Sequence, residues 1–478
     1  MLAAGGLTAL VAPGAVRGAA TFGRAGTGRY YTRPDLTPPL IDVATSEPGA
    51  APGFIFLAPF TGPSQHGPLI VDNAGEPVWF RPSTTLASFN FRPQKFHGKP
   101  VLTWWEGKVN ADGYYEGDCV IMDTSYRVLK RLATTGYVTE EHEFVITSRN
   151  TALIGAVNPI ATDLSPYGGA PGDTLVDSVF QEIDIDTGKV LLTWHSTDHV
   201  TPDESYIDVT NGWDYFHLNS IGVDTDGNLL VSARNTSAVY KVDRASGEVI
   251  WRLGGKKSDF HLGPGAAFAY QHDARGRGNG LISIFDDGAH RASDTFESTS
   301  RAIVLSIDTN TMTATLVQAM PNPHGSLTTL MGNAQLLPDG GWFVGWGGLP
   351  EYSEFSPTGE IRYDASFADG GVSYRAFRNV WKATPTTRPN VAASGNTDGT
   401  TDVFASWNGA TEVRHWRFLG GAARNALRPL QTVPRSGFET SLHLAKAPPY
   451  IAAVALDANR RTLASSRTIR TQLAPATA

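Results

Sequence analysis

The sequence is poor in cysteine, in charge and in long apolar runs, and each shortage excludes a class of protein. Cys119 is the one cysteine among 478 residues, so no intramolecular disulfide can form and a four-cysteine zinc site is excluded. Lys and Arg number 39 against 46 Asp and Glu, a formal charge of −7. This balance argues against general nucleic-acid binding, which needs a basic surface. After the N-terminal segment no apolar run reaches the ~20 residues that a membrane span needs.

Motifs for nucleotide binding and for common hydrolases are absent as well. The chain has no G-x-x-x-x-G-K-[ST] phosphate loop, no H-E-x-x-H pair, and no G-x-S-x-G elbow between a strand and a helix. The glycine-rich segment Gly23–Arg29 lacks the lysine and the preceding strand of a phosphate loop. These absences disfavour a nucleotide-dependent transferase.

The first 20 residues have some features of an export signal. A short apolar run is followed by small residues, and Gly18 and Ala20 suit positions −3 and −1 of a signal-peptidase site. A basic segment before the apolar run is missing, so the alternative is a disordered Ala/Gly tail. We expect a truncated signal peptide over residues 1–20 and a secreted or cell-envelope protein.

Glycine, proline and aromatic residues are abundant: 50 Gly, 30 Pro and 10% Phe, Trp and Tyr. This composition favours many short strands joined by tight turns. One unit recurs along the chain, and it consists of an apolar strand, an acidic or glycine turn and a second strand. Its six copies are 70–79, 121–129, 183–194, 242–251, 307–315 and 355–362.

Another strand pair precedes each copy, as at Ser220–Arg234 and Asn333–Trp346. Their Asp-Gly turns suit hairpins because glycine tolerates positive φ. Two hairpins per repeat make a four-stranded blade, and six blades close radially. No helical periodicity recurs between the strands, which argues against a parallel α/β sheet. The sequence therefore predicts an all-β fold with a six-bladed β-propeller over residues 21–382.

The chain changes character after Trp381. A Pro/Thr-rich linker, 383–392, precedes short alternating runs such as Val403–Trp407 and Tyr450–Leu456. Alternation bounded by turn residues is typical of strands, and about 90 residues of it suit a small β-sandwich. We expect a C-terminal β-sandwich-like domain over residues 393–478, with no catalytic role.

Four histidines precede the inner strands of successive repeats: His142, His217, His272 and His324. In a radial array such side chains point to a common axis, where polar groups far apart in sequence meet. The pattern favours a shared functional site, and the alternative is a set of histidines that hydrogen-bond between blades. His142, flanked by two carboxylates, suits a helper or bracing role better than a direct one.

A ring of histidines with arginine suits two kinds of chemistry. The spacing is not local, so it leaves a zinc or copper site open. Alternatively, a neutral imidazole attacks a phosphoryl or sulfuryl centre, a second histidine passes protons, and an arginine fork neutralises the oxyanion. Arg291 and Arg301 are candidates for that fork, and the alternative for each is a surface or strand-end role.

Several segments together resemble the arylsulfotransferase (arylsulfate sulfotransferase-like) family, in its actinobacterial and fungal branch. They are short singly and specific in combination: 100–107, 142–144, 177–184, 214–220, 251–256, 271–275, 332–335 and 437–440. The resemblance implies a six-bladed propeller that moves a sulfuryl group from an aryl sulfate to a phenol, without the nucleotide donor PAPS. It also implies a sulfated histidine as intermediate, and neither a cofactor nor a metal.

Carried over position by position, the resemblance implies catalytic roles for His217, His272, Arg291 and His324. His324 would be the nucleophile, with His272 as the other candidate, and His217 and Arg291 would bind the sulfuryl oxygens. The expected partners are a small aromatic sulfate ester and a phenol, with no nucleic acid. We therefore expect a sulfotransferase.

Trp213, Tyr215, Asn219 and Asn333 are the expected substrate-binding residues. The two aromatic rings would stack on an aryl group, and the alternative is that they only pack between blades. Two other functions stay open at this point. One is a non-catalytic exported propeller that binds a cell-surface glycan or protein, and the other is a metal- or quinone-dependent oxidoreductase.

Overall fold

The computed structural model describes residues 23–24, 30–62, 65–83, 86–111 and 113–471. The expected signal segment, 1–20, lies outside these residues. Within them nearly every element is a strand, and the helical elements are α1 (Ser196–His199), η1 (Ser165–Tyr167) and η2 (Pro202–Glu204). No helix in this part of the chain has the length and apolar character needed to cross a membrane. The all-β prediction is confirmed.

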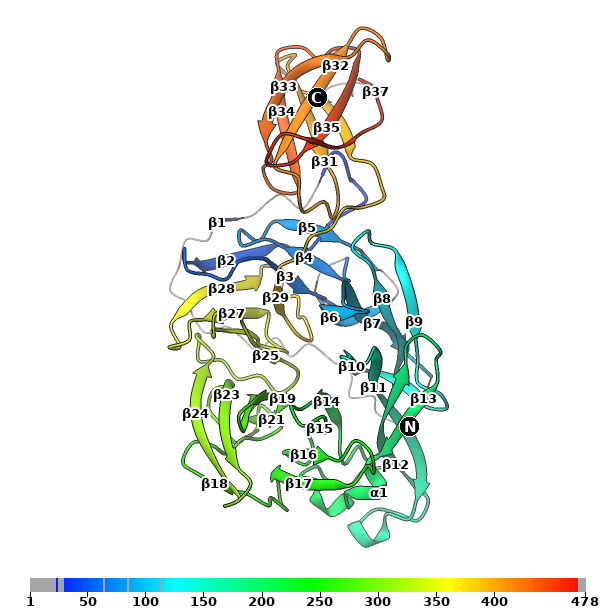
Figure 1. The fold of residues 1–478 in the computed structure, drawn as a ribbon, viewed down its shortest axis with the longest axis vertical. Helices are drawn as coiled ribbons and strands as arrows, with labels where there is room; N and C mark the ends of the chain where they lie inside the picture. The colour runs from blue at the N-terminus through cyan, green and yellow to red at the C-terminus, as the bar shows by residue number, and fades with distance from the viewer. Residues whose placement is uncertain (1–22, 25–29, 63–64, 84–85, 112, 472–478) are drawn as a thin grey trace.

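Six sheets stand around a common axis, as the blades of a β-propeller do (Figure 1). The first three follow the chain order, with the innermost strand first. Their strands are β6 (Ala87–Phe96), β7 (Lys99–Val109), β8 (Tyr115–Met122), β9 (Val128–Leu132); β10 (Val138–Ile146), β11 (Thr151–Thr162), β12 (Asp173–Asp184), β13 (Val190–His195); and β14 (Leu218–Val223), β15 (Leu229–Ala233), β16 (Ala238–Val242), β17 (Val249–Gly254).

The fourth and fifth sheets carry additional strands at their outer edges. The fourth contains β19 (His272–Gly278), β20 (Leu281–Asp286), β23 (Arg301–Asp308), β24 (Thr313–Pro321) and, parallel to β24, β18 (His261–Leu262). A small hairpin, β21 (Ala289–Arg291) and β22 (Asp294–Thr295), interrupts it. The fifth contains β25 (Asn333–Leu336), β26 (Trp342–Gly345), β27 (Glu351–Phe355), β28 (Ile361–Phe367), β2 (Ile41–Ser46) and β1 (Gly23–Arg24).

The sixth sheet closes the ring with strands from distant parts of the chain. It contains β29 (Phe377–Asn379), β3 (Phe54–Leu57), β4 (Leu69–Val71) and β5 (Pro77–Phe80). Phe377 of β29 lies opposite Phe56 of β3 in an antiparallel register. This closure was not part of the sequence prediction. The six repeated units themselves are confirmed, because each forms the outermost hairpin of its sheet's four blade strands, from β4–β5 to β27–β28.

Hydrophobic clusters fill the interfaces between neighbouring sheets. Leu230 and Val239 of the third sheet pack with Ile282 and Ile303 of the fourth, for example, and five further clusters fill the other interfaces. The free Cys119 is fully buried in the cluster between the first and second sheets. Because both faces of each blade are packed, polar side chains collect at the axis and at the two ends of the ring.

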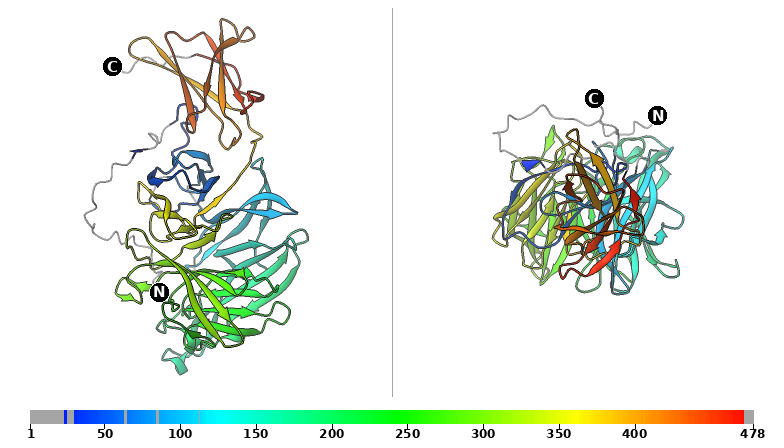
Figure 2. Two further views of the ribbon diagram at one scale, coloured as in Figure 1. Left: turned by 60° about the vertical axis from the view of Figure 1, so that its left-hand side comes forward. Right: turned by 90° about the horizontal axis from the view of Figure 1, so that it is seen from above.

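Two further sheets follow the ring and lie beyond its sixth sheet (Figure 2). They consist of β30 (Asn390–Gly395), β31 (Thr401–Ser406), β34 (Glu439–Leu444), and of β33 (Arg428–Pro434), β32 (His415–Gly421), β35 (Tyr450–Leu456), β36 (Thr462–Ser465), with β37 (Ile469–Arg470) beside β35. They enclose a core of their own, as a β-sandwich does. Asn408 hydrogen-bonds both backbone groups of Phe80 and so ties them to the sixth sheet. The exact boundaries at 383 and 393 stay predictions.

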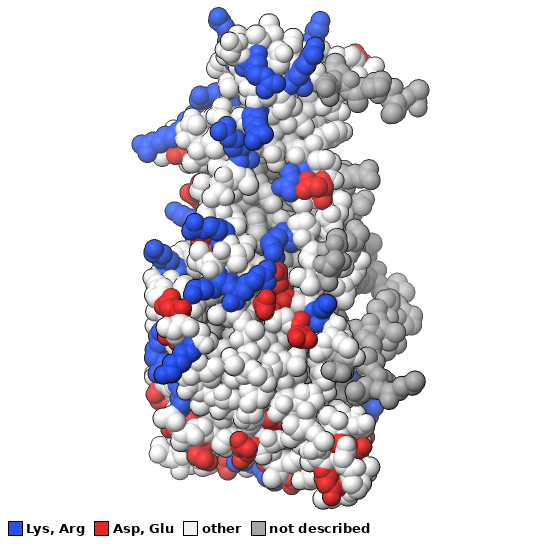
Figure 3. Space-filling model, turned by 90° about the vertical axis from the view of Figure 1, so that its right-hand side faces the viewer, with Lys and Arg blue, Asp and Glu red and all other residues white. Residues whose placement is uncertain are grey.

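The C-terminal sheets differ from the ring in charge. Residues 383–478 contain eleven Lys and Arg against five Asp and Glu, although the whole chain is acidic. On the face drawn in Figure 3, Lys and Arg dominate the end formed by these sheets, and Asp and Glu are more frequent toward the opposite end. The acidic excess therefore belongs to the propeller.

Candidate active site

The inner strands of the first four sheets are irregular near their starts. Their pairing registers shift between residues 89 and 92 of β6, 139 and 144 of β10, 218 and 220 of β14, and 272 and 275 of β19. His217 and Asp273 also hold left-handed backbone, with φ of 56° and 52°. Bulges of this kind re-aim side chains and occur beside active sites. Because these bulges lie on the innermost strands, they indicate that a site lies at the axis.

Three of the four expected histidines meet at the axis around Tyr374. The ring centroid of His142 lies 4.7 Å from that of His217 and 5.7 Å from that of Tyr374. The His272 centroid lies 6.4 Å from that of Tyr374. Tyr374 precedes the innermost strand of the sixth sheet, and its hydroxyl donates to the carbonyl of Asn219 in the third sheet, 3.3 Å away. We call His142, His217, His272 and Tyr374 the histidine cluster.

The Nδ1 atom of each histidine is hydrogen-bonded to a carboxylate. Asp214 binds the Nδ1 of His217 at 2.5 Å, and Asp287 binds the Nδ1 of His272 at 2.8 Å. Glu140 binds the Nδ1 of His142. Such a partner fixes the orientation of the ring and favours the proton on Nδ1. The arrangement leaves the Nε2 atom of a neutral histidine as the basic and nucleophilic one.

The Nε2 atoms of His217 and His272 have different surroundings. His272 is buried, and its Nε2 accepts the backbone N–H of Met331 at 3.2 Å. No protein group in the described part of the chain hydrogen-bonds to the Nε2 of His217, whose side chain is 28% exposed. His217 lines a pocket of about 130 Å³ together with His142, Glu141 and Asp214. It is the better placed of the two to meet a substrate.

The electrostatics of the cluster divide the histidines by charge. Burial lowers the pKa of His142, but the carboxylates of Glu140 and Glu141 outweigh this effect and raise the pKa to about 9. Burial also raises the pKa of Glu141 to about 7. For His272, burial and then the positive charge of Arg234 lower the pKa well below its usual range. At neutral pH the cluster therefore contains a protonated His142 and a neutral His272, each in contact with Tyr374.

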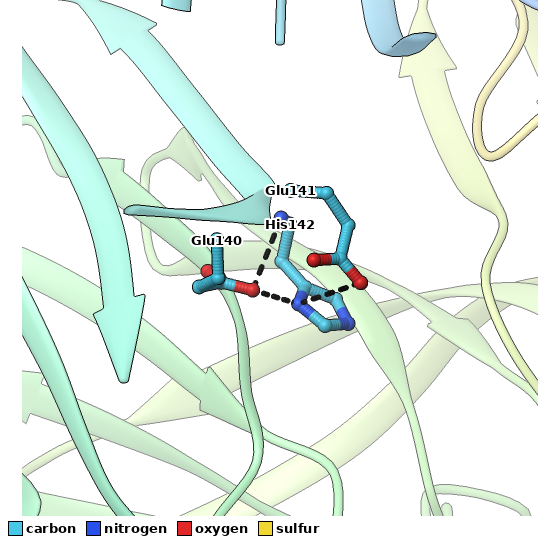
Figure 4. Close-up of side chains that lie close together, drawn as sticks. All are labelled: Glu140, Glu141 and His142. Atoms are coloured by element: carbon cyan, nitrogen blue, oxygen red, sulfur yellow. Dashed lines mark hydrogen bonds and ion pairs between the residues drawn. The ribbon is translucent and has the colours of Figure 1, made fainter. Parts of the chain in front are cut away.

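Glu140, Glu141 and His142 are also arranged as metal ligands are. One ligand atom from each lies within 4.8 Å of the others, and Figure 4 shows both carboxylates turned toward the imidazole. Carboxylate oxygens and imidazole nitrogens are common ligands of divalent transition metals. These three residues are the candidates for a metal site in the part of the chain that the structure describes.

A buried ion cluster fills the axis beyond the histidines. Glu143 accepts hydrogen bonds from Arg92 at 2.9 Å, from Arg375 at 3.2 Å and from Arg275. Asp273 accepts from Arg275 at 2.7 Å. Burial raises the pKa of Glu143, but the three arginines hold it far below its usual range. We call these five residues the axial plug.

The structure does not bring His324 and Arg291 to the histidine cluster. The Nε2 of His324 lies 3.0 Å from Asp364 of β28, which is three strands outward from the innermost strand of its sheet. Met331 holds the place just before the inner strand β25 instead. Arg291 is exposed on the β21–β22 hairpin, and no hydrogen bond or ion pair joins it to the cluster among the described residues. Arg301 pairs with Asp286, at 2.9 Å.

The expected substrate-binding residues lie in the walls of the ring. Trp213 and Tyr215 belong to the hydrophobic cluster between the second and third sheets, and their polar atoms donate to backbone carbonyls. Asn219 and Asn333 are fully buried and donate to carbonyls beside the next inner strand. These positions favour packing for the aromatic rings and bracing for the asparagines, and substrate-binding roles for the four stay predictions.

Several residues of the site were not selected from the sequence, among them Glu140, Arg234, Asp287 and Tyr374. Arg234 is buried, lies 5.3 Å over the ring of Tyr270 and donates to the carbonyl of Thr329 at 2.8 Å. For Glu140 the sequence did contain a signal, because carboxylates lie within three residues of both His142 and His217. Tyr374 had none, because its contacts with His142, His272 and Asn219 come from other blades.

The fold and the site define a class of protein, a six-bladed β-propeller with carboxylate-held histidines at its axis. Residues 92–368, more than half of the chain, match the arylsulfotransferase (ASST) family. The protein belongs to this family, as the resemblance of the sequence segments had indicated. A search of curated proteins gives no match.

The solved structures that resemble this chain are distant in sequence. A protein of unknown function from Bacteroides caccae is 15% identical over 68% of this chain and 98% of its own, with a TM-score of 0.43. Virginiamycin B lyase from Staphylococcus aureus is 12% identical over 58% and 87%, with a TM-score of 0.30. The periplasmic gluconolactonase PpgL of Pseudomonas aeruginosa is 12% identical over 87% and 96%, with a TM-score of 0.29. The assignment of the fold rests on the sheet order described above.

Proposed function

We propose that this protein is a PAPS-independent aryl sulfate sulfotransferase that transfers a sulfuryl group to a phenol through a sulfated histidine. Its membership of the arylsulfotransferase family supports the reaction class. The observation that carries the mechanism is the environment of His217, whose Nδ1 is bound by Asp214 and whose Nε2 is free at the pocket. This choice replaces His324, which lies outside the cluster, as the nucleophile.

In the first step the Nε2 lone pair of His217 forms a bond to the sulfur of the donor, and the bond from sulfur to the aryl oxygen breaks. His142, protonated below its pKa of about 9, gives a proton to the departing phenolate. The Asp214 carboxylate stabilises the positive charge that the His217 ring acquires. The products are a phenol and a sulfated His217.

In the second step the acceptor phenol takes the place of the released one. Its hydroxyl proton passes to the now neutral His142, and its oxygen bonds to sulfur while the nitrogen–sulfur bond breaks. Both histidines return to their starting states. Burial raises the pKa of Tyr374 well above its usual range, so its hydroxyl gives up a proton less readily than the hydroxyl of an acceptor phenol.

The test follows nitrophenolate release from 4-nitrophenyl sulfate, with and without a phenol acceptor. We expect acceptor-stimulated release that falls about 10⁴-fold in His217→Ala, because removal of a nucleophile removes the covalent route. His443→Ala, at an exposed histidine of β34, is the matched control and keeps full activity. If His324→Ala lost activity and His217→Ala kept it, the nucleophile would be His324 and not His217. No release from the unchanged protein with any acceptor would contradict the proposal.

A further inference from the structure

The ends of all six inner strands surround a second cavity, of about 600 Å³. Its lining draws on β6, β10, β14, β19, β25 and β29, so it lies on the axis of the ring. No residue of the histidine cluster lines it. We call it the arginine mouth, and the pocket of the histidine cluster the histidine mouth.

Positive charge dominates the lining of the arginine mouth. Four cationic side chains contribute to it, Arg92, Lys95, Arg275 and Arg277, against the single carboxylate of Asp273. Glu143, behind the lining, balances part of this charge through its ion pairs with Arg92 and Arg275. Buried charges are normally paired, so the surplus of cations marks the cavity as a place for an anion.

Arg277 is the least compensated of these cations. Its Nε donates to the Ser283 hydroxyl at 2.8 Å and one Nη to the Ala334 carbonyl at 2.7 Å, and its guanidinium lies 5.3 Å over the Trp342 ring. No carboxylate forms an ion pair with it in the described part of the chain. Burial lowers its pKa to about 10, which is the direction expected of a cation that lacks a full counter-charge.

Arg92 contributes positive charge to the lining of the same cavity. One of its Nη atoms donates to Glu143 and to the Phe144 carbonyl, both within 2.9 Å. Its Nε is buried and has no hydrogen-bond partner among the described residues. Because this atom has almost no exposed surface, a ligand in the cavity does not reach it, and Arg92 contributes its charge rather than a free hydrogen bond.

We propose that the arginine mouth binds a doubly charged tetrahedral oxyanion, either a free sulfate or phosphate ion or the phosphate group of an organic monoester. Arg277 and Lys95 supply the charge that no carboxylate of the described residues balances. A cavity of this size also accommodates a small organic group beside the anion. This binding site is separate from the sulfuryl-transfer site and uses none of its residues.

The proposal is tested by calorimetric titration of the full chain with sodium sulfate and, separately, with phenyl phosphate, at an ionic strength held constant with sodium chloride. We expect one anion per chain with at least one of the two. Binding of sulfate identifies the free ion as a ligand, and binding of phenyl phosphate alone identifies an organic ester. Heats no larger than those of added chloride, with both ligands, would overturn the proposal.

Variants assign the binding to this cavity. We expect Arg277→Gln to weaken binding at least tenfold, Arg277→Lys to weaken it less, and the exposed rim variant Lys95→Gln to weaken it about threefold. Lys189→Gln, at an exposed turn far from the cavity lining, is the matched control. Unchanged affinity in both Arg277→Gln and Lys95→Gln would contradict the site. His217→Ala should bind the anion normally, so failure here and failure of the sulfotransferase are distinguishable.

Discussion

The two mouths of the propeller share the inner strands β10 and β14 and have opposite chemistry. At the strand starts, histidines are held by Asp214, Glu140 and Asp287. At the strand ends, guanidinium groups line a cavity with a single carboxylate. The axial plug lies between them and takes its members from both sides of the ring.

The comparison shows how one set of strands supports two environments. The two ends of an inner strand lie at separate positions along the axis, so they can carry side chains of different charge. The ion pairs of the plug lie between the two charge sets, and Arg375 and Glu143 are fully buried there. Cations without a full counter-charge favour an anion at one mouth, and at the other the carboxylates lie beside the protonated His142.

The largest effect is expected from removal of the charge that separates the mouths. Glu143→Gln leaves three buried arginines with one fewer counter-charge, so we expect a loss of about 3–5 kcal/mol in the free energy of unfolding. Urea unfolding measures it. Glu248→Gln, at an exposed position, is the control, and its change should stay within about 0.5 kcal/mol. Equal stabilities for the two variants would mean that the plug does not support the ring.

An intermediate effect is expected from the acid of the histidine mouth. His142→Gln should lower kcat for 4-nitrophenyl sulfate about 10²-fold, because the leaving phenolate then has no proton donor. The proton of His142 is present below its pKa of about 9 and lost above it. Activity of the unchanged protein should therefore fall above pH 9, and this fall should be absent in the variant. If activity fell above pH 9 in the variant as well, a group other than His142 would be the cause.

The smallest effect is expected from Glu141, whose carboxylate is charged above its pKa of about 7 and neutral below it. A charged carboxylate repels an anionic donor, so Glu141→Gln should lower the KM for the donor a few-fold at pH 8 and leave it unchanged at pH 6. The change corresponds to about 1 kcal/mol or less. KM values at the two pH values measure it, with Glu248→Gln as control. A variant effect of equal size at both pH values would exclude charge as the cause.

The blades themselves were predictable because each repeat is a local unit. Strand, turn and strand follow one another within about a dozen residues, as at 242–251, and each such segment is a hairpin in the structure. The closure of the ring was not predictable in this way. The pairing of β29 with β3 joins two segments at opposite ends of the propeller sequence. No turn connects them, so no local sequence signal predicts that they pair.

The histidine cluster was predictable only in part. His217 and His272 directly precede or begin inner strands, so their positions in the repeat placed them at the axis. His324 lies in the longer segment between β24 and β25. Because that segment has no fixed length in the repeat, the sequence does not show which residue lies just before β25, and in the structure it is Met331. The arginine mouth had no sequence signal, because Arg92 and Arg277 come from different blades and meet only through the curvature of the ring.

The short sixth sheet has a mechanical consequence. The ring is closed by the backbone hydrogen bonds between Phe377–Asn379 and Phe54–Phe56, and no covalent bond reinforces them in the described residues. The chain leaves β29 directly toward the C-terminal sheets. A pulling force on those sheets therefore reaches this three-residue clasp along the backbone, and it reaches β5 of the same sheet through the Asn408 contacts. Tension on the C-terminal sheets thus loads the sheet that closes the ring.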